Sequence, residues 1–200
     1  MRERFPFRPS GLEERKCYYE KEFSVWKVKR WFRKQGMKLP QICALDAGTE
    51  TGIIIDKKYA GQMLYFAFSK LKEKIKKYLP EDVYYDRNFY DNPEKVLRTL
   101  RFTKPLKQEL VFDVDADNIK CSHPRREQVC SICLNKACNS AIELKKILRK
   151  RFNKIKIIYS GRGFHVHVDD RKAFLLSFKE RNELNKELKK SPIDPWVSGG

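Results

Sequence analysis

The chain has 200 residues, of which 41% are hydrophobic and 35% charged, so it is long enough for one substantial domain and short for two. Lysine and arginine number 44 against 26 acids, and the resulting formal charge of +18 favours a polyanionic partner, nucleic acid before an anionic membrane. No stretch approaches the roughly 20 apolar residues of a membrane-spanning helix and no charged-then-apolar leader opens the chain, so we expect a soluble intracellular protein without membrane partners.

The first part of the chain predicts helices and short strands. Aromatic and aliphatic residues recur in a loosely helical pattern over residues 18–36, and the basic residues among them either contact phosphates or form an ordinary solvated face. Residues 41–57 predict short strands around a turn. Over residues 61–79, apolar positions at three- and four-residue intervals predict a core-facing helix that ends at Pro80.

Strands and helices alternate in the second part. The segment from Asp82 predicts a short strand, a turn and a short helix, and the stretch SAIELKKILRKRF and residues 170–190 predict two further helices. We expect an α+β fold in which helices cover a mixed β-sheet, within one catalytic domain over residues 1–200. The strands expected in that sheet are residues 83–86, 109–115, 155–159 and 164–168.

Two acids two positions apart stand out in the strand sequence ELVFDVDADN. Asp113 and Asp115 project from the same face, because side chains alternate along a strand. Their like charges repel each other, and a divalent cation such as Mg²⁺, which prefers carboxylate oxygens, would relieve that repulsion. The alternative is a strand end that carries solvated acids.

Cysteine and histidine gather in the stretch CSHPRREQVCSIC. Cys121 and His123 form one closely spaced pair, and Cys130 and Cys133 form another. This ligand set suits tetrahedral Zn²⁺ and leaves no open position, so the metal is expected to be structural rather than catalytic. Unligated surface thiols are the alternative, and Cys138 is a spare candidate ligand.

A glycine-containing turn joins the last two expected strands in YSGRGFHVHV. Ser160, the backbone N–H groups of the two glycines and the guanidinium of Arg162 make a cradle that suits phosphate, although an ordinary turn has the same composition. His165 and His167 follow on one face of the strand, where core histidines are the common alternative.

These features together indicate nucleotidyl transfer. Such chemistry requires carboxylates that hold two divalent ions beside a triphosphate. One ion lowers the pKa of the attacking 3′-hydroxyl, and the other stabilises the leaving pyrophosphate. Two aspartates are usually too few for this task, and Asp194 in PIDPWVSG is the expected third acid.

The order and spacing of ELVFDVDADN, CSHPRREQVCSIC and YSGRGFHVHV resemble the catalytic small subunit of archaeal and eukaryotic DNA primases, and VYYDRNFYDNP is similar to a segment that precedes these motifs. The resemblance covers residues 80–168 well and the first 60 residues loosely. It implies the primase catalytic fold with a zinc-binding stem at about residues 119–138. The implied zinc ligands are Cys121, His123, Cys130 and Cys133.

The resemblance also implies the roles of the site residues. Asp113 and Asp115 would bind catalytic Mg²⁺ or Mn²⁺, and Asp194 would be the third catalytic aspartate. The phosphates of the incoming nucleoside triphosphate would lie against Ser160, Arg162 and His165. The family continues beyond the third aspartate with a strand of pattern R-L-x-x-S-x-H that this sequence lacks, so we expect an incomplete C-terminal end that a second chain or missing sequence completes.

The implied function is the synthesis of short RNA or DNA primers on a single-stranded DNA template during replication. The implied partner is a large iron–sulfur subunit or a companion chain, and the implied location is the cytoplasm of an archaeal cell or a eukaryotic nucleus. A primase-like repair polymerase is one alternative, although such relatives commonly lack the zinc cluster. A non-catalytic zinc-containing nucleic-acid-binding module would leave the paired aspartates unexplained, and a two-metal nuclease would not need the glycine turn.

Overall fold

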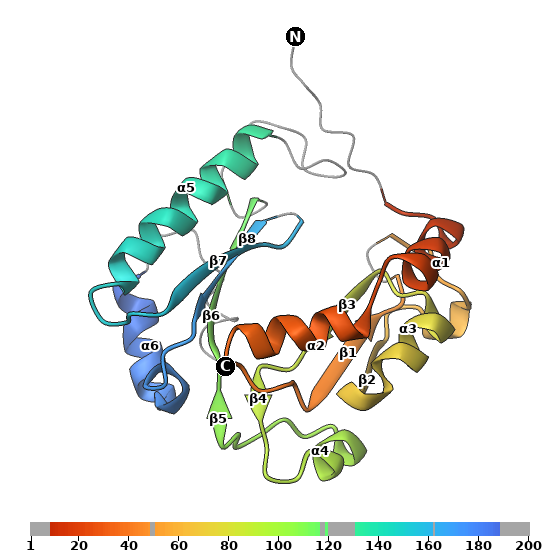
Figure 1. Cartoon of the computed structure of the whole chain (residues 1–200), viewed down its shortest axis with the longest axis horizontal. Helices are drawn as coiled ribbons and strands as arrows, with labels where there is room; N and C mark the ends of the chain where they lie inside the picture. The colour runs from red at the N-terminus through yellow and green to blue at the C-terminus, as the bar shows by residue number, and fades with distance from the viewer. Residues whose placement is uncertain (1–8, 49–50, 117–118, 120–130, 162, 189–200) are drawn as a thin grey trace. The chain divides into compact units, whose positions relative to one another are not determined.

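The computed structural model describes residues 9–48, 51–116, 119, 131–161 and 163–188 (Figure 1). The described residues group into two compact units, one over residues 9–107 and one from residue 108 onward. Both units combine helices with antiparallel strands, which agrees with the expected α+β class. The expectation of one catalytic domain over residues 1–200 stays a prediction.

The first unit is built on a three-stranded antiparallel sheet of order β2-β1-β3. One face of this sheet packs with helices α1 and α3 in an apolar core that includes Leu45, Phe66 and Ile75. The short strands β4 and β5 form a separate two-stranded sheet. The helices and strands are α1 (Leu12–Lys21), α2 (Val25–Lys34), β1 (Ile42–Asp46), β2 (Met63–Ala67), α3 (Leu71–Tyr78), β3 (Asp82–Tyr85), β4 (Asn88–Phe89), α4 (Pro93–Thr99) and β5 (Lys107–Gln108), with 3-10 turns at Lys57–Tyr59 and Phe68–Lys70.

Three expectations for this unit were wrong in detail. The helical pattern over residues 18–36 is interrupted before Ser24, whose side chain caps the start of α2 by accepting a hydrogen bond from the backbone of Lys27. The helix expected over residues 61–79 begins only at Leu71, because the preceding segment pairs with β1 as strand β2. The described residues within 41–57 form one strand, β1, rather than several.

The second unit is a three-stranded antiparallel sheet of order β6-β8-β7 with α5 packed against all three strands (Figure 1). Alternate residues of β6, among them Phe112 and Val114, point into a core that α5 fills with Ala141 and Leu144. Burial of a large aliphatic or aromatic side chain stabilises such a core by about 1.5–3 kcal/mol. The elements are β6 (Leu110–Asp115), α5 (Ser131–Leu148), β7 (Ile155–Tyr159), β8 (Gly163–Val168), a 3-10 turn (Ala173–Leu175) and α6 (Phe178–Glu187).

The prediction of a single mixed sheet was wrong, although the four expected strands all form within a residue or so of their expected bounds. Strand β3 belongs to the sheet of the first unit, while β6, β7 and β8 form the sheet of the second. Strands β6 and β7 run in the same direction, but β8 lies between them and pairs antiparallel with both. The helical connection through α5 therefore produces no parallel pair.

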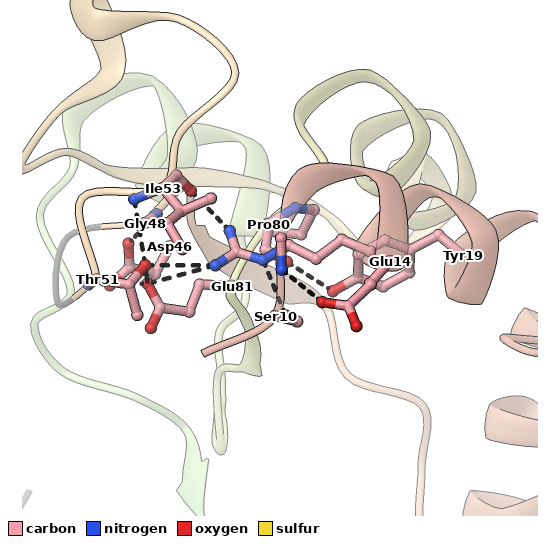
Figure 2. A network of polar contacts seen from close by, with 11 residues as sticks. Ser10, Glu14, Tyr19, Asp46, Gly48, Thr51, Ile53, Pro80 and Glu81 are labelled. Atoms are coloured by element: carbon pink, nitrogen blue, oxygen red, sulfur yellow. Dashed lines mark hydrogen bonds and ion pairs between the residues drawn. The ribbon is translucent and has the colours of Figure 1, made fainter. Parts of the chain in front are cut away.

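A buried arginine connects α1 to the loop after β1 in the first unit (Figure 2). The guanidinium of Arg15 donates hydrogen bonds to the backbone carbonyl of Ile53 at 2.8 Å, to Oγ of Ser10 at 3.1 Å and to Oγ1 of Thr51 at 3.3 Å. Thr51 in turn donates a 2.9 Å hydrogen bond to the carboxylate of Glu81. The network satisfies a charge that would be costly to bury alone.

We expect Arg15→Met to lower the free energy of unfolding by about 2 kcal/mol, because the part-buried carbonyl of Ile53 loses its donor and the Glu81 carboxylate, which keeps its hydrogen bond from Thr51, loses a neighbouring positive charge. Denaturation followed by circular dichroism measures this loss. Lys16→Met, at an exposed position of the same helix, is the matched control and should change stability by no more than about 0.5 kcal/mol. Equal stability of the two variants would show that the network does not stabilise the unit.

Candidate active site

Strands β6 and β8 bring acids and histidines together on the sheet face opposite α5. The core-facing residues of both strands leave Asp113, Asp115 and His165 on the other face. The antiparallel register places Asp113 opposite His165 and Asp115 opposite Gly163. Two motifs that are about fifty positions apart in the sequence thus become direct neighbours in the sheet.

Asp113 lies in a partly enclosed position beside an imidazole. Its Oδ1 atom is 3.1 Å from Nε2 of His165, and the two side chains are 19% and 37% exposed. Despite this short distance, Oδ1 is buried and accepts no aligned hydrogen bond from any of the described residues. A buried carboxylate oxygen with spare acceptor capacity fits a hard divalent cation as its partner.

The two histidines of β8 differ in their protonation. Burial by itself would lower the pKa of His165, but the nearby carboxylate of Asp113, with a contribution from Asp115, outweighs burial and leaves that pKa raised. Burial lowers the pKa of His167 to about 4, and the charge of His165 acts in the same direction. One face of one strand therefore carries a histidine whose pKa is raised and a histidine whose pKa is lowered.

Gly163 allows the turn before β8 to approach the acid strand closely. A Cβ atom at this position would lie 2.6 Å from the carbonyl oxygen of Val114 and 2.7 Å from Oδ1 of Asp115, which is closer than real Cβ atoms come. The backbone N–H of Ser160 donates to the carbonyl of Gly163 at 3.0 Å, and the N–H of Gly163 donates to Oγ of Ser160 at 3.2 Å. The hairpin turn is thus closed upon itself, directly beside Asp115.

The structure brings together Asp113, Asp115, Ser160 and His165, four of the residues that the sequence selected. Cys133 lies in the first turn of α5 and is buried. Among the described residues, no three histidine, cysteine or acidic side chains are grouped as a metal site requires. The positions outside the described residues, whose roles stay predictions, are Cys121, His123, Cys130, Arg162 and Asp194.

The sequence analysis missed a basic residue on the same sheet face. Lys156 of β7 lies opposite His167 in the register and forms an ion pair with the buried carboxylate of Asp169. The alternation of KIKIIY contains the signal that could have revealed it, because Lys156 stands between Ile155 and Ile157, which pack in the core. The face therefore carries a fixed positive charge as well as the two acids.

Comparison with known proteins decides the family. A family model described as DNA primase small subunit matches residues 112–192, which include both aspartates and the glycine turn. A DNA primase small subunit-like protein of Archaeoglobus fulgidus is 32% identical over an alignment of 234 positions, which covers 100% of this chain and 80% of that protein. The chain belongs to the DNA primase small subunit family. The resemblance to archaeal-type primases is thereby confirmed.

Other members of the family are longer than this chain. DNA primase small subunit PriS of Pyrobaculum calidifontis is 35% identical over 143 residues, which cover 68% of this chain and 45% of that protein. PriS of Pyrococcus horikoshii is 33% identical over 189 residues, which cover 91% of this chain and 50% of that protein. The chain thus spans half or less of these PriS relatives.

We expect Asp113→Asn to lower the pKa of His165, because the variant removes the neighbouring charge that opposes the effect of burial. Nuclear magnetic resonance titration of the imidazole signals measures the change, and the signal of His167, which should remain neutral down to about pH 4, is told apart by its lower titration range. Since an unfolded histidine titrates near pH 6.5, His167 should also make stability fall as the pH drops from about 6.5 towards 4. An unchanged pKa of His165 in the variant would contradict the coupling.

Proposed function

We propose that this chain is the catalytic part of a DNA primase, which synthesises short RNA or DNA primers from nucleoside triphosphates on single-stranded DNA. The observation that supports the proposal is the β6–β8 register, which sets Asp113 and Asp115 beside the glycine turn inside the segment that matches the family. Acids beside a phosphate cradle serve nucleotidyl transfer better than simple binding, since acids by themselves repel a nucleic acid.

The acids are the proposed metal ligands. Asp113 and Asp115 would hold Mg²⁺ or Mn²⁺, with Asp194 as the third carboxylate, and the unsatisfied Oδ1 of Asp113 fits this role. When bound, such ions activate the attacking 3′-hydroxyl and neutralise charge that develops on the phosphates. The chain itself contributes fixed geometry, because the paired strands hold both carboxylates on one face before any ligand arrives.

The turn and the histidine are the proposed phosphate-binding groups. The closed turn fixes Ser160 next to Gly163, and Arg162 between them would supply a guanidinium for a bidentate contact with phosphate oxygens. The raised pKa of His165 lets it donate a charge-assisted hydrogen bond to a phosphate oxygen. His165 and the metal ions would together contact the oxygens of the triphosphate.

The proposed partners follow from charge and family. With a formal charge of +18, the chain suits a single-stranded DNA template and its growing primer, held mainly through phosphates. We also propose a large iron–sulfur primase subunit or a companion chain as the protein partner. Every helix in the described ranges is too short or too polar to cross a bilayer.

The double variant Asp113→Asn, Asp115→Asn tests the proposal. It should reduce metal-dependent primer synthesis on single-stranded DNA below detection while it leaves folding and DNA binding intact, because the site loses both charges that would hold the metal ions. Incorporation of labelled nucleotides with Mg²⁺ or Mn²⁺, with and without a companion chain, is the measurement. Asp91→Asn, at an exposed position outside the site, is the matched control.

Synthesis that survives the double substitution would remove the two aspartates from the mechanism. If neither the wild type nor the variant makes product although both bind DNA, the binding-module alternative is favoured over the enzyme.

We further propose that a structural zinc ion is bound in the segment of about residues 119–138. Bound zinc would favour a primase over a repair polymerase, because such polymerases commonly lack the zinc cluster. Cys130→Ser should remove most of the zinc, because a tetrahedral site loses one of four ligands. Elemental analysis of the purified protein measures the content. Cys138→Ser, within α5, is the matched control and should keep the metal; loss of zinc only in that variant would reassign the ligand set.

A further inference from the structure

The sheet of the first unit leaves one face uncovered by its main core. Residues Cys43 and Leu45 of β1 point into that core, so Ala44 between them points to the other face. The register places Ala44 opposite Tyr65 on β2 and opposite Tyr84 on β3. These three residues form a row across the sheet, with the smallest side chain in the middle.

The two tyrosines of this row are exposed. Tyr65 is 42% and Tyr84 is 45% exposed, and Met63 beside Tyr65 on the same face is also exposed. Because neighbouring strands lie about 4.8 Å apart, the two tyrosines are separated by about 9.5 Å across β1. This separation is too large for one base to stack on both rings, so each ring offers its own stacking surface.

The two sides of the row, along the strand direction, differ in charge. On one side of the row, Asp46 of β1 pairs with Asp82 of β3 in the register, and these acids would repel phosphates. On the other side, Ile42 packs with Val96 of α4, and α4 also packs beside β2. Ala44 and Asp46 are themselves buried, so the exposed part of the row is its two tyrosines, with acids on one side and α4 and the loop after it on the other.

The segment after α4 supplies positive charge at that end. Phe102 packs against Tyr65 with ring centroids 4.8 Å apart, which fixes this segment beside the row. Exposed basic side chains surround Phe102 in the sequence: Arg98, Arg101 and Lys104. Aromatic rings flanked by lysine and arginine are the surface that proteins use for single-stranded nucleic acids, whose bases are free to stack.

We propose that the row of Tyr65, Ala44 and Tyr84, here called the tyrosine row, binds single-stranded nucleic acid by stacking one base on each tyrosine, with the phosphates directed towards Arg98, Arg101 and Lys104. The inference rests on the proposed function, because the single-stranded nucleic acid bound there would be the template of the primase. It adds a base-stacking surface in residues 9–107, separate from the acids and the glycine turn of the second unit.

Fluorescence anisotropy with a labelled oligothymidylate, without added divalent metal, tests the tyrosine row apart from catalysis. Tyr65→Ser and Tyr84→Ser should each raise the Kd between about fivefold and about a hundredfold, because each variant loses one stacked base. Tyr65→Phe and Tyr84→Phe should bind as the wild type does, since the ring is retained. Phe178→Ser, which replaces a 67% exposed aromatic residue of α6, is the matched control and should bind normally.

Salt dependence separates stacking from phosphate contacts. The tyrosine variants should keep the wild-type slope of log Kd against log salt, whereas Arg101→Ser should reduce that slope by about 0.7. Circular dichroism confirms that each variant is folded. A Kd within twofold of wild type for both folded serine variants, or an equal loss in Phe178→Ser, would overturn the proposal and favour a protein partner for this face.

A failure of the tyrosine row can be distinguished from a failure of the proposed function. If the Asp113→Asn, Asp115→Asn variant loses synthesis while the tyrosine variants bind normally, the enzyme stands and the tyrosine row is wrong. If the tyrosine variants lose binding while the wild type makes no primer, the tyrosine row stands and the catalytic proposal is wrong.

Discussion

The antiparallel pairing of β6 with β8 is the constraint on which the candidate site rests. Side chains alternate along both strands, so the register that buries Phe112 and Val114 also commits Asp113 and Asp115 to the opposite face. A slip of one residue would bury the acids and expose the core. The apolar contacts with α5 thus hold the charged groups in place, and their hydrophobic stabilisation offsets the repulsion between the two carboxylates.

The same face shows how burial and charge set the properties of similar groups differently. His165 and His167 are two positions apart on one strand with ring centroids 6.1 Å apart. The acids opposite His165 raise its pKa, whereas deeper burial dominates at His167 and lowers its pKa. Protonation of one ring disfavours protonation of the other, because their like charges would lie close together. The strand therefore offers two imidazoles whose pKa values are shifted in opposite directions.

The sequence predicted the second unit better than the first, for a physical reason. Strand 163–168 alternates strictly, and strands 110–115 and 155–159 alternate over part of their length, a signal that one buried face imposes directly. Residues 61–70 satisfy helical and strand spacing at once, and only the pairing of β2 with β1, a contact between distant segments, decides between them. The expected single mixed sheet was wrong for the same reason: nothing local reveals that β3 pairs with β1 or that β8 lies between β6 and β7.

The acids and the glycine turn could be selected from their sequence motifs, but their neighbours could not. That Gly163 must lack a side chain follows from Asp115 lying across the strand pair, which requires the register. Lys156 and the tyrosine row likewise gain meaning only when the core-facing side of each strand is known. Chemistry that resides in one motif is visible in sequence, whereas chemistry shared between strands needs the fold.

Each sheet has one face that packs in its main apolar core, and the opposite faces carry side chains that suit different parts of a nucleotide. In the second unit the face carries carboxylates, an ion-paired lysine and a protonatable histidine, which suit metal ions and phosphates. In the first unit the face carries tyrosine rings around an alanine, which suit bases, since every base has a flat surface that stacks without regard to sequence. A template-reading polymerase must grip bases of any sequence and reserve its charged groups for the reacting phosphates. Under the proposed function, the two sheets would divide these tasks, since one carries the charged groups and the other carries the tyrosine rings.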